Sequence, residues 1–245
     1  APFIPTTKGF SLLIDCGANV DARPEHLVQF AQMGSIYYEN VMGKKNPTVA
    51  LLNIGTEEEK GNQLVKDTKP LMKECKNINY IGSVEARALV SGAADVIVCE
   101  AFVGNVVLKF FEGLALTLFG SLKEGLMSST RTKLGALLVK PALKGLKNQF
   151  DTSSQGGAPL LGLKGLVVKA HGNSSSKEIE IALKQCISFK KQKINEKIKE
   201  NIPVEMKEIS LAEAKEAGFT GLFESKYGEV VKTYTIGDFS REICG

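Results

Sequence analysis

The chain has 245 residues, of which 43% are hydrophobic and 24% charged, with 24 glycines and 8 prolines. This ordinary globular composition excludes a collagenous, low-complexity or disordered chain, and the length suits one large α/β domain or two small ones. No apolar run is expected to reach the roughly 18 to 20 residues of a membrane span. Residues 1–5 show neither an initiating Met nor a basic segment, so no signal peptide is expected. Five scattered cysteines form no CxxC pair, which favours the reducing cytoplasm.

The net charge of +4 is too small to indicate nucleic-acid binding, and no nucleic acid is expected as a partner. The charge is unevenly distributed. Residues 105–150 hold seven basic side chains and two acidic ones, so this one segment carries more than the whole excess.

Four short apolar runs each end in a loop of small residues. They cover residues 11–15, 49–53, 95–99 and 166–169. Uninterrupted apolar runs of this length are typical of strands buried on both faces. Helical patterns follow three of them, over 24–42, 57–73 and 174–191. Strand, loop and helix repeated in this way predict an α/β fold with a mostly parallel sheet, in which ligands bind at the carboxyl ends of the strands.

The basic segment 105–150 is predicted to form two helices separated near residues 128–130. In the second helix, leucines recur at three- and four-residue steps with lysines between them, and Pro141 would kink or restart it. One interpretation is a helical arm that packs against a partner subunit. The other is an element that lies on an anionic membrane surface, since apolar residues flanked by lysine suit lipid headgroups.

The tail from about residue 195 has a different pattern. A charged, helix-favouring run over 190–201 stops at Pro203. An alternating run over 204–209 leads into a capping box, Ser210 to Glu213, and a β-rich run covers 230–236. We therefore expect residues 195–245 to form a small α+β unit distinct from residues 1–194.

The loops at the strand ends are rich in glycine and small polar residues, which let backbone N–H groups approach an anion. We expect a phosphate-friendly cleft there. Its candidate substrate- or phosphate-binding residues are Asp15, Gly17, Asn19, Asp21, Asn53, Gly55, Lys60, Gly104, Gly156 and Gly157. Its candidate catalytic residues are Lys169, His171 and Asn105. In particular, Asn19, Lys60, Asn105, Lys169 and His171 are expected to border one cleft, with Lys169 and His171 countering the charge of phosphate.

Several of the reactive side chains admit two interpretations. His171 is either an acid/base or phosphate-binding group or a histidine bonded to a loop carbonyl. His26, near the start of a helix, favours a capping role. Cys16 and Cys99 could be nucleophiles, but a cysteine that ends a buried strand is more often a small hydrophobic residue. No GxSxG, Walker, HExxH or Rossmann motif occurs in the required context, and neither a metal nor a cofactor is expected.

Six motifs follow one another along residues 1–195. They are DCGANVD at 15–21, PEHLVQF at 24–30, LNIG at 52–55 with EEEKG at 57–61, FVGN at 102–105, GGAP at 156–159 and KAHG at 169–172. In this order they resemble PlsX, the phosphate acyltransferase family of bacterial phospholipid synthesis. The resemblance implies a three-layer α/β/α sandwich related to phosphotransacetylases and isocitrate-type dehydrogenases, which dimerises. It also implies transfer of a fatty acyl group from acyl carrier protein to inorganic phosphate.

The residue inventory suits that reaction. Phosphate can attack a thioester directly, and the leaving thiol has a pKa of about 8.5, so no strong general acid is required. Asn19 and Asn105 could orient phosphate or the thioester carbonyl. Members of the family begin with a further segment that this chain is expected to lack. The alternatives are a phosphotransacetylase-like enzyme that uses acyl-CoA, and a catalytically inactive fragment.

The tail resembles the editing-domain region of alanyl-tRNA synthetase. The resemblance lies in NEKIKENIPV at 195–204, LAEAK at 211–215, KYG at 226–228 and IGDFSREICG at 236–245. Cys244 would be one of the three or four ligands that a zinc site needs, so no metal is expected there. We expect the tail to be a fusion rather than a functional partner of residues 1–194, with few apolar contacts to them.

Overall fold

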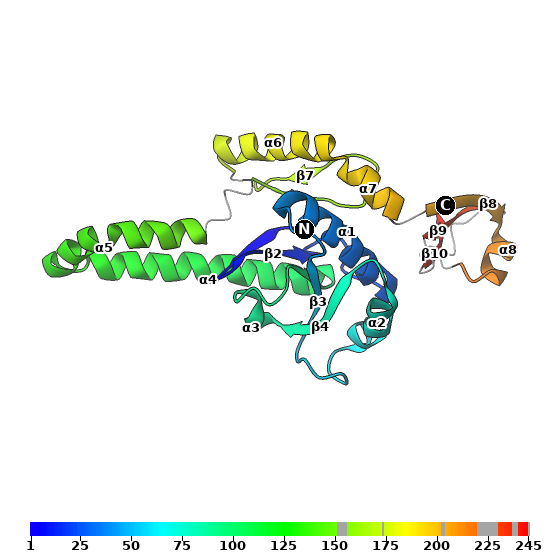
Figure 1. The fold of residues 1–245 in the computed structure, drawn as a ribbon, viewed down its shortest axis with the longest axis horizontal. Coiled ribbons are helices and arrows are strands. Elements are labelled where there is room, and N and C mark those ends of the chain that lie inside the picture. Colours follow the sequence, from blue (N-terminus) through cyan, green and yellow to red (C-terminus); the bar gives the residue numbers. More distant parts are fainter. Residues whose placement is uncertain (151–155, 173, 202–203, 220–229, 237–239, 245) are drawn as a thin grey trace.

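A computed structural model shows an α/β core from which an elongated helical arm extends, with a small terminal unit beside the core (Figure 1). It describes residues 1–245 apart from 151–155, 173, 202–203, 220–229, 237–239 and 245. The KYG motif at 226–228 therefore lies outside the described residues, and the motifs at 195–204 and 236–245 lie partly outside them.

The core is built on a five-stranded sheet with the order β1-β2-β5-β3-β4. Its strands are β1 (Phe3–Thr6), β2 (Gly9–Ile14), β3 (Thr48–Asn53), β4 (Asn79–Glu85) and β5 (Val96–Val98). β1 pairs antiparallel with β2, and the other neighbours pair in parallel. Three of the four predicted strands are confirmed as β2, β3 and β5. Their apolar side chains, among them Leu12, Leu13 and Leu51, are fully buried, and each contributes about 2 kcal/mol.

The fourth predicted strand, over 166–169, is wrong as a member of this sheet. Only β7 (Val168–Lys169) is extended, and it pairs antiparallel with β6 (Ala158–Pro159) in a separate two-stranded ladder. Val167 remains 41% exposed and Lys169 is exposed, so this run is not buried on both faces. A short apolar run by itself does not decide which sheet a strand joins.

Helices cover both faces of the sheet, which makes the fold a three-layer α/β/α sandwich. α1 (Pro24–Met42) and α2 (Gln63–Glu74) bury one core cluster against one face. Short α3 (Ala86–Leu89) and the start of α4 (Ala101–Met127) cover the other. α6 (Ser176–Gln192) and α7 (Ile194–Asn201) pack on α1, where Phe189 meets the ring of Tyr37 edge-on. The predicted helix over 57–73 begins only at Gln63, because Asn62 caps it and residues 54–61 form a loop.

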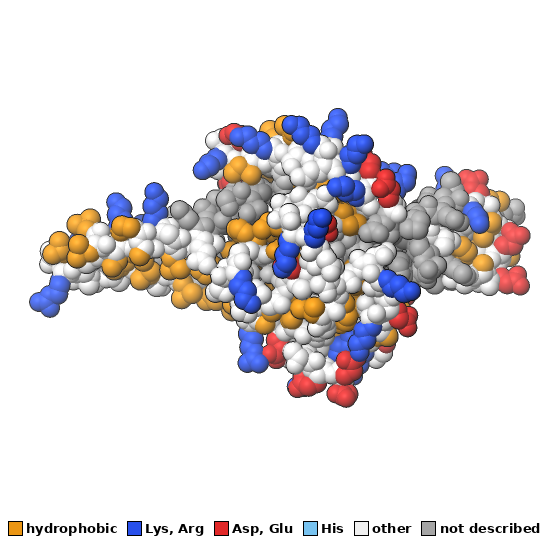
Figure 2. All heavy atoms as spheres, in the orientation of Figure 1, with side chains coloured by type: hydrophobic (Ala, Val, Ile, Leu, Met, Phe, Trp, Pro, Cys, Tyr) orange, Lys and Arg blue, Asp and Glu red, His pale blue; other side chains and the backbone are white. Residues whose placement is uncertain are grey.

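The arm consists of α4 and α5 (Thr130–Gln149), which run antiparallel and project away from the sheet (Figure 1). The two predicted helices and the break near 128–130 are confirmed, but α5 continues through Pro141 without restarting. Hydrophobic side chains lie exposed along the arm, interspersed with lysine and arginine (Figure 2). Leu116, Leu137 and Leu138 are 66–80% exposed. Among the residues that the structure describes, one helix, α4, is long and apolar enough to cross a membrane by length and composition, which corrects the expectation from the sequence.

The tail contains β8 (Val204–Ser210), α8 (Leu211–Glu216), β9 (Val230–Ile236) and β10 (Ser240–Cys244). Its strands form their own antiparallel sheet, ordered β10-β9-β8, and Ser210 and Glu213 form the predicted capping box. The predicted boundary at residue 194 coincides with the start of α7, yet Ile194 and Ile198 of this helix belong to the main core cluster. The part that stands apart in Figure 1 thus begins at β8. The division into two units stays a prediction.

Candidate active site

The carboxyl ends of β2, β5 and β3 lie next to one another at one edge of the sheet, because these strands are parallel neighbours. The loop after β2, the start of α4 after β5, and the loop after β3 therefore meet the solvent on the same side. This is the edge at which parallel α/β sheets bind their ligands.

Asp15 organises the loop after β2. Its buried carboxylate accepts hydrogen bonds from the backbone N–H of Asn19 at 2.8 Å and from the Asn19 side-chain amide at 3.0 Å. These donors are engaged within the loop, so Asp15 shapes the loop rather than facing an anion. Gly17, at φ +133°, needs the conformational freedom of glycine, and it is exposed together with Asn19 and Asp21.

The first turn of α4 packs directly on this loop. The N–H of Ala101 donates to the Asn19 carbonyl at 3.1 Å, and a Cβ on Gly104 would lie 1.9 Å from the Asp15 carbonyl oxygen. Gly104 is therefore required for the close approach of helix and loop. The carboxylate of Glu100 accepts the N–H groups of Phe102 and Val103, so this helix start is capped by its own chain.

The loop after β3 is held by Asn53, whose side-chain amide donates to the carbonyls of Gly55 and Lys60, each at 2.9 Å. Lys60 is exposed, and its ammonium lies 3.0 Å from the Glu57 carboxylate. This ion pair helps to hold the pKa of Glu57 below its ordinary value, after the larger effect of a backbone hydrogen bond.

His171 reaches α4 from the β6–β7 hairpin. Its Nε2 lies 3.6 Å from the carboxylate of Glu112, which also binds the ammonium of Lys109 at 2.8 Å. Asn105, Lys109 and Glu112 are four and three residues apart, so they share one face of α4. We call Asn105, Lys109, Glu112 and His171 the α4 polar face. Lys109 and Glu112 were not predicted as site residues. The only indication of them in the sequence is their spacing from Asn105.

The sequence-predicted residues thus fall into three groups. Asp15, Gly17, Asn19 and Gly104 come together through the contacts of the loop after β2 with α4. Asn53, Gly55 and Lys60 form a second group in the loop after β3. Asn105 lies on α4 and His171 lies beside Glu112 of that helix, while Lys169 is exposed in β7, two residues before His171. The expectation that Asn19, Lys60, Asn105, Lys169 and His171 border one cleft stays a prediction.

Gly156 and Gly157 have a packing explanation. A Cβ on Gly156, at φ +76°, would lie 2.6 Å from the Ala182 nitrogen in α6. A Cβ on Gly157 would lie 2.8 Å from the Lys169 carbonyl oxygen. Both glycines therefore let the hairpin approach its neighbours.

The two cysteines near this edge are poorly suited to nucleophilic catalysis. Burial raises the pKa of the Cys16 thiol to about 12, and burial raises the pKa of Cys99 well above its ordinary value. A thiol that stays protonated near neutral pH is a poor nucleophile. His26 also takes its predicted capping role, since its Nδ1 accepts the backbone N–H of Arg23.

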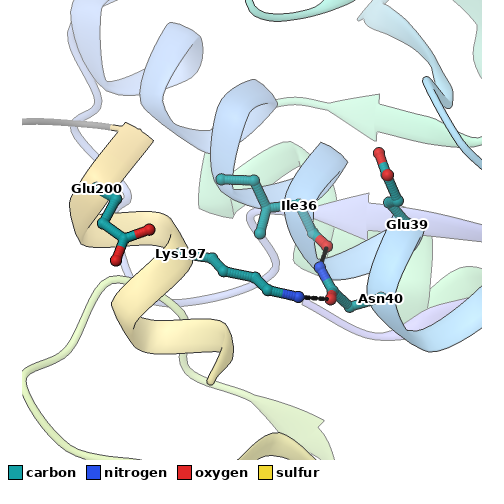
Figure 3. Close-up of a pocket in the computed structure, with 5 residues that line it drawn as sticks. All are labelled: Ile36, Glu39, Asn40, Lys197 and Glu200. Atoms are coloured by element: carbon teal, nitrogen blue, oxygen red, sulfur yellow. Dashed lines mark hydrogen bonds between the residues drawn. The ribbon is translucent and has the colours of Figure 1, made fainter. Parts of the chain in front are cut away.

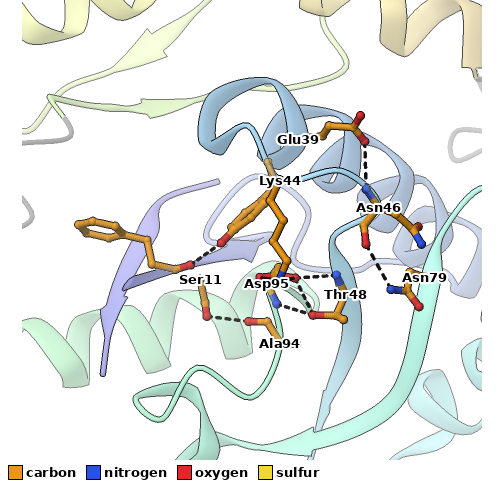
Figure 4. A network of polar contacts seen from close by, with 10 residues as sticks. Ser11, Glu39, Lys44, Asn46, Thr48, Asn79, Ala94 and Asp95 are labelled. Atoms are coloured by element: carbon orange, nitrogen blue, oxygen red, sulfur yellow. Dashed lines mark hydrogen bonds and ion pairs between the residues drawn. The ribbon is translucent and has the colours of Figure 1, made fainter. Parts of the chain in front are cut away.

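The opposite edge of the sheet is occupied by structural contacts. Asp95 accepts hydrogen bonds from Lys44 and from Thr48 at 2.7–2.8 Å, next to Ser11 and Ala94 (Figure 4).

A shallow hollow lies between α1 and α7, lined by Ile36, Glu39, Asn40, Lys197 and Glu200, and Lys197 donates to the Asn40 side chain there (Figure 3). Across the described ranges, no group of three or more His, Cys, Asp or Glu side chains is placed to hold a metal ion.

Comparison with known proteins identifies the family of the chain. Residues 1–197 match the sequence profile of a family described as "Fatty acid synthesis protein". The chain is 49% identical over 206 residues to the phosphate acyltransferase of Clostridium novyi (strain NT), covering 84% of this chain and 62% of that protein. It is 52% identical over 202 residues to that of Alkaliphilus oremlandii, covering 82% and 60%. The chain belongs to the phosphate acyltransferase (PlsX) family. It spans about 60% of the length of these curated relatives.

The match to this family covers the whole core and the arm, and it ends within α7. The phosphate acyltransferase of Clostridium acetobutylicum is similar in the same way, with 50% identity over 198 residues. The tail from β8 onward lies outside the matched profile. Its resemblance to an alanyl-tRNA synthetase stays a prediction.

Proposed function

We propose that the protein transfers a fatty acyl group from acyl carrier protein to inorganic phosphate, giving acyl phosphate for phospholipid synthesis. The observation that carries the proposal is the 49–52% identity to phosphate acyltransferases over about 200 residues. The high thiol pKa values of Cys16 and Cys99 agree with it, because direct attack by phosphate needs no enzyme thiolate.

In the proposed reaction a phosphate oxygen attacks the thioester carbonyl carbon. A C–O bond forms, the C–S bond breaks, and the carrier leaves as a thiolate that takes a proton from solvent. Lys169 and His171 would balance the charge of phosphate, and the Lys109 ammonium would add a further positive charge. Asn19 and Asn105 would donate hydrogen bonds to phosphate or to the developing oxyanion.

The test is formation of acyl phosphate by the purified 245-residue chain with phosphate and either acyl-acyl carrier protein or acyl-CoA. The phosphate acyltransferase of Clostridium novyi serves as the positive control. Activity with the carrier protein at least about tenfold above that with acyl-CoA supports the proposal. A preference for acyl-CoA supports the phosphotransacetylase-like alternative. No product from this chain, while the control is active, supports a catalytically inactive fragment.

We also propose that the protein is a cytoplasmic homodimer whose arm contacts an anionic membrane surface. Exposed leucines beside lysines on α4 and α5 support this, since they combine apolar burial with charge attraction. Ala101 and Gly104 anchor the first turn of α4 to the core. The part of α4 beyond Glu112, residues 113–127, is about 23 Å long, less than the roughly 30 Å of a bilayer core, which favours lying on the membrane over spanning it.

A further inference from the structure

The buried face of α2 contains a lysine that the proposed function has not used. The residues Val65, Thr68, Lys69 and Met72 stand at i, i+3, i+4 and i+7, the spacing of one helix face. Thr68, Lys69 and Met72 are all buried, and Lys69 is only 3% exposed. A lysine on such a face is rare, because burying an ammonium is costly unless it is fully hydrogen-bonded.

Lys69 meets this requirement with backbone carbonyls. Its Nζ donates to the carbonyl oxygens of Glu57, Glu58 and Lys60, at 3.0, 2.6 and 3.0 Å. An ammonium has three N–H donors and no acceptor, so three carbonyl oxygens satisfy it completely. All three carbonyls belong to the loop after β3, one of the loops at the candidate active-site edge.

A second side chain, Asn53 at the end of β3, also forms hydrogen bonds with this loop. The Asn53 amide donates to the carbonyls of Gly55 and Lys60, so the Lys60 carbonyl is shared between Asn53 and Lys69. A Cβ on Gly61, at φ +120°, would lie 2.8 Å from the Asn53 side-chain oxygen and 2.7 Å from Val65. The backbone of this loop is therefore restricted to a conformation that makes the hydrogen bonds to both Asn53 and Lys69.

We infer that Lys69 is a positioning residue: with Asn53 it holds the backbone of residues 55–60 so that the Lys60 ammonium is presented at the carboxyl end of β3 as a cation for phosphate. The inference rests on the proposed function for the role of Lys60. The immobilisation of the loop by Lys69 stands independently of it. A site whose cation is already fixed loses less conformational freedom on binding, so it binds its anion more tightly.

The test compares Lys69→Met with Lys73→Met in the full chain. Lys73 lies one turn further along α2, is exposed, and pairs with the Glu58 carboxylate at 2.6 Å, so it touches the same loop only from outside. The rate of backbone hydrogen exchange is measured by mass spectrometry. In a second assay a glutamyl endopeptidase is added, and its rate of cleavage after Glu57–Glu59 is measured. In Lys69→Met we expect both rates in residues 54–61 to rise about tenfold or more, with β2 and β5 still protected. In Lys73→Met we expect less than about a twofold change.

Phosphate kinetics separate positioning from a general structural role. In Lys69→Met the KM for phosphate is expected to rise at least about fivefold while kcat stays within about twofold. Unchanged loop exchange overturns the inference, as does a uniform rise across the core. If Lys69→Met does not fold, Lys69→Gln, which keeps two N–H donors, takes its place. Failure of both to fold, with Lys73→Met folded, also overturns it.

The same experiment distinguishes this inference from the proposed function. If the unmodified chain forms no acyl phosphate, the proposed function fails, and hydrogen exchange still decides whether Lys69 fixes the loop. If the unmodified chain is active and Lys69→Met leaves the phosphate KM unchanged, the positioning role fails and the proposed function stands.

Discussion

Gly104 lies where the first turn of α4 packs on the loop after β2. A Cβ there would lie 1.9 Å from a backbone oxygen that cannot move without displacing β2. We expect Gly104→Ala to lower the free energy of unfolding by about 3 kcal/mol, measured by urea denaturation. Gly113→Ala is the matched control, since a Cβ at Gly113 on the same helix meets nothing within 4 Å. It should be neutral or stabilising by up to about 1 kcal/mol. Equal effects at both positions would contradict this explanation.

Asp95 should make stability depend on pH. Burial alone would raise its pKa, but hydrogen bonds from Lys44 and Thr48 outweigh burial and hold the pKa below its ordinary value. The contribution is therefore complete above the unfolded pKa of about 3.9 and is lost as pH falls through the lower folded value. We expect the melting temperature of Asp95→Asn to fall less between pH 5 and pH 3 than that of the unmodified chain. Parallel curves would exclude this role for Asp95.

Lys169 and His171 should govern phosphate affinity. Because Lys169 and His171 are exposed and not part of the core, replacing them with Met and Gln should leave the fold intact. The KM for phosphate is expected to rise about tenfold in each variant, with a smaller change in the KM for the acyl donor. Lys164→Met, an exposed lysine in the same segment, is the control. A change confined to the acyl donor would place these residues elsewhere in the mechanism.

The arm exposes leucine side chains that a binding partner or a membrane surface could cover. Leu137 and Leu138 are 66% and 80% exposed, and Leu143, which is partly buried, lies five residues beyond Leu138 on α5. We expect the triple replacement of these leucines by Glu to abolish flotation with anionic liposomes, and salt to weaken flotation of the unmodified chain. Replacement of Lys123, on α4, by Gln should reduce flotation only in part. Undiminished flotation of the triple variant would remove the membrane role.

Helix ends that are set by local caps were predicted correctly, and helix ends that are set by distant side chains were not. α1 was predicted to its ends, because Pro24 fixes its start and Gly43 in the left-handed conformation its end. α2 began six residues later than predicted, because the loop before it is held by Asn53 and Lys69, which are distant side chains. β4 was missed, since its residues are only partly buried and give no uninterrupted apolar run.

At the scale of the whole molecule, the described part of the tail has a small hydrophobic cluster of its own. Its small cluster of Ala214 and Val231 packs with Ile209, Leu211 and Phe219, all from the tail itself. We expect a chain that ends at residue 203 to melt within about 2 °C of the full chain, because a core that loses no packing keeps its stability. Scanning calorimetry measures this. A fall of more than about 5 °C would show that the tail stabilises the core, against the predicted fusion.

The sequence by itself determined the α/β class, the three central strands, the helical arm and the family, because buried strands, caps and loop motifs are local patterns. Only the tertiary structure decided that residues 166–169 leave the main sheet and that α7 packs with the core. It also decided that His171 reaches Glu112 and that Lys69 holds a loop nine or more residues before it in sequence. These contacts join side chains from different elements. Their distances depend on how helices and hairpins pack, and no local pattern in the chain encodes that packing.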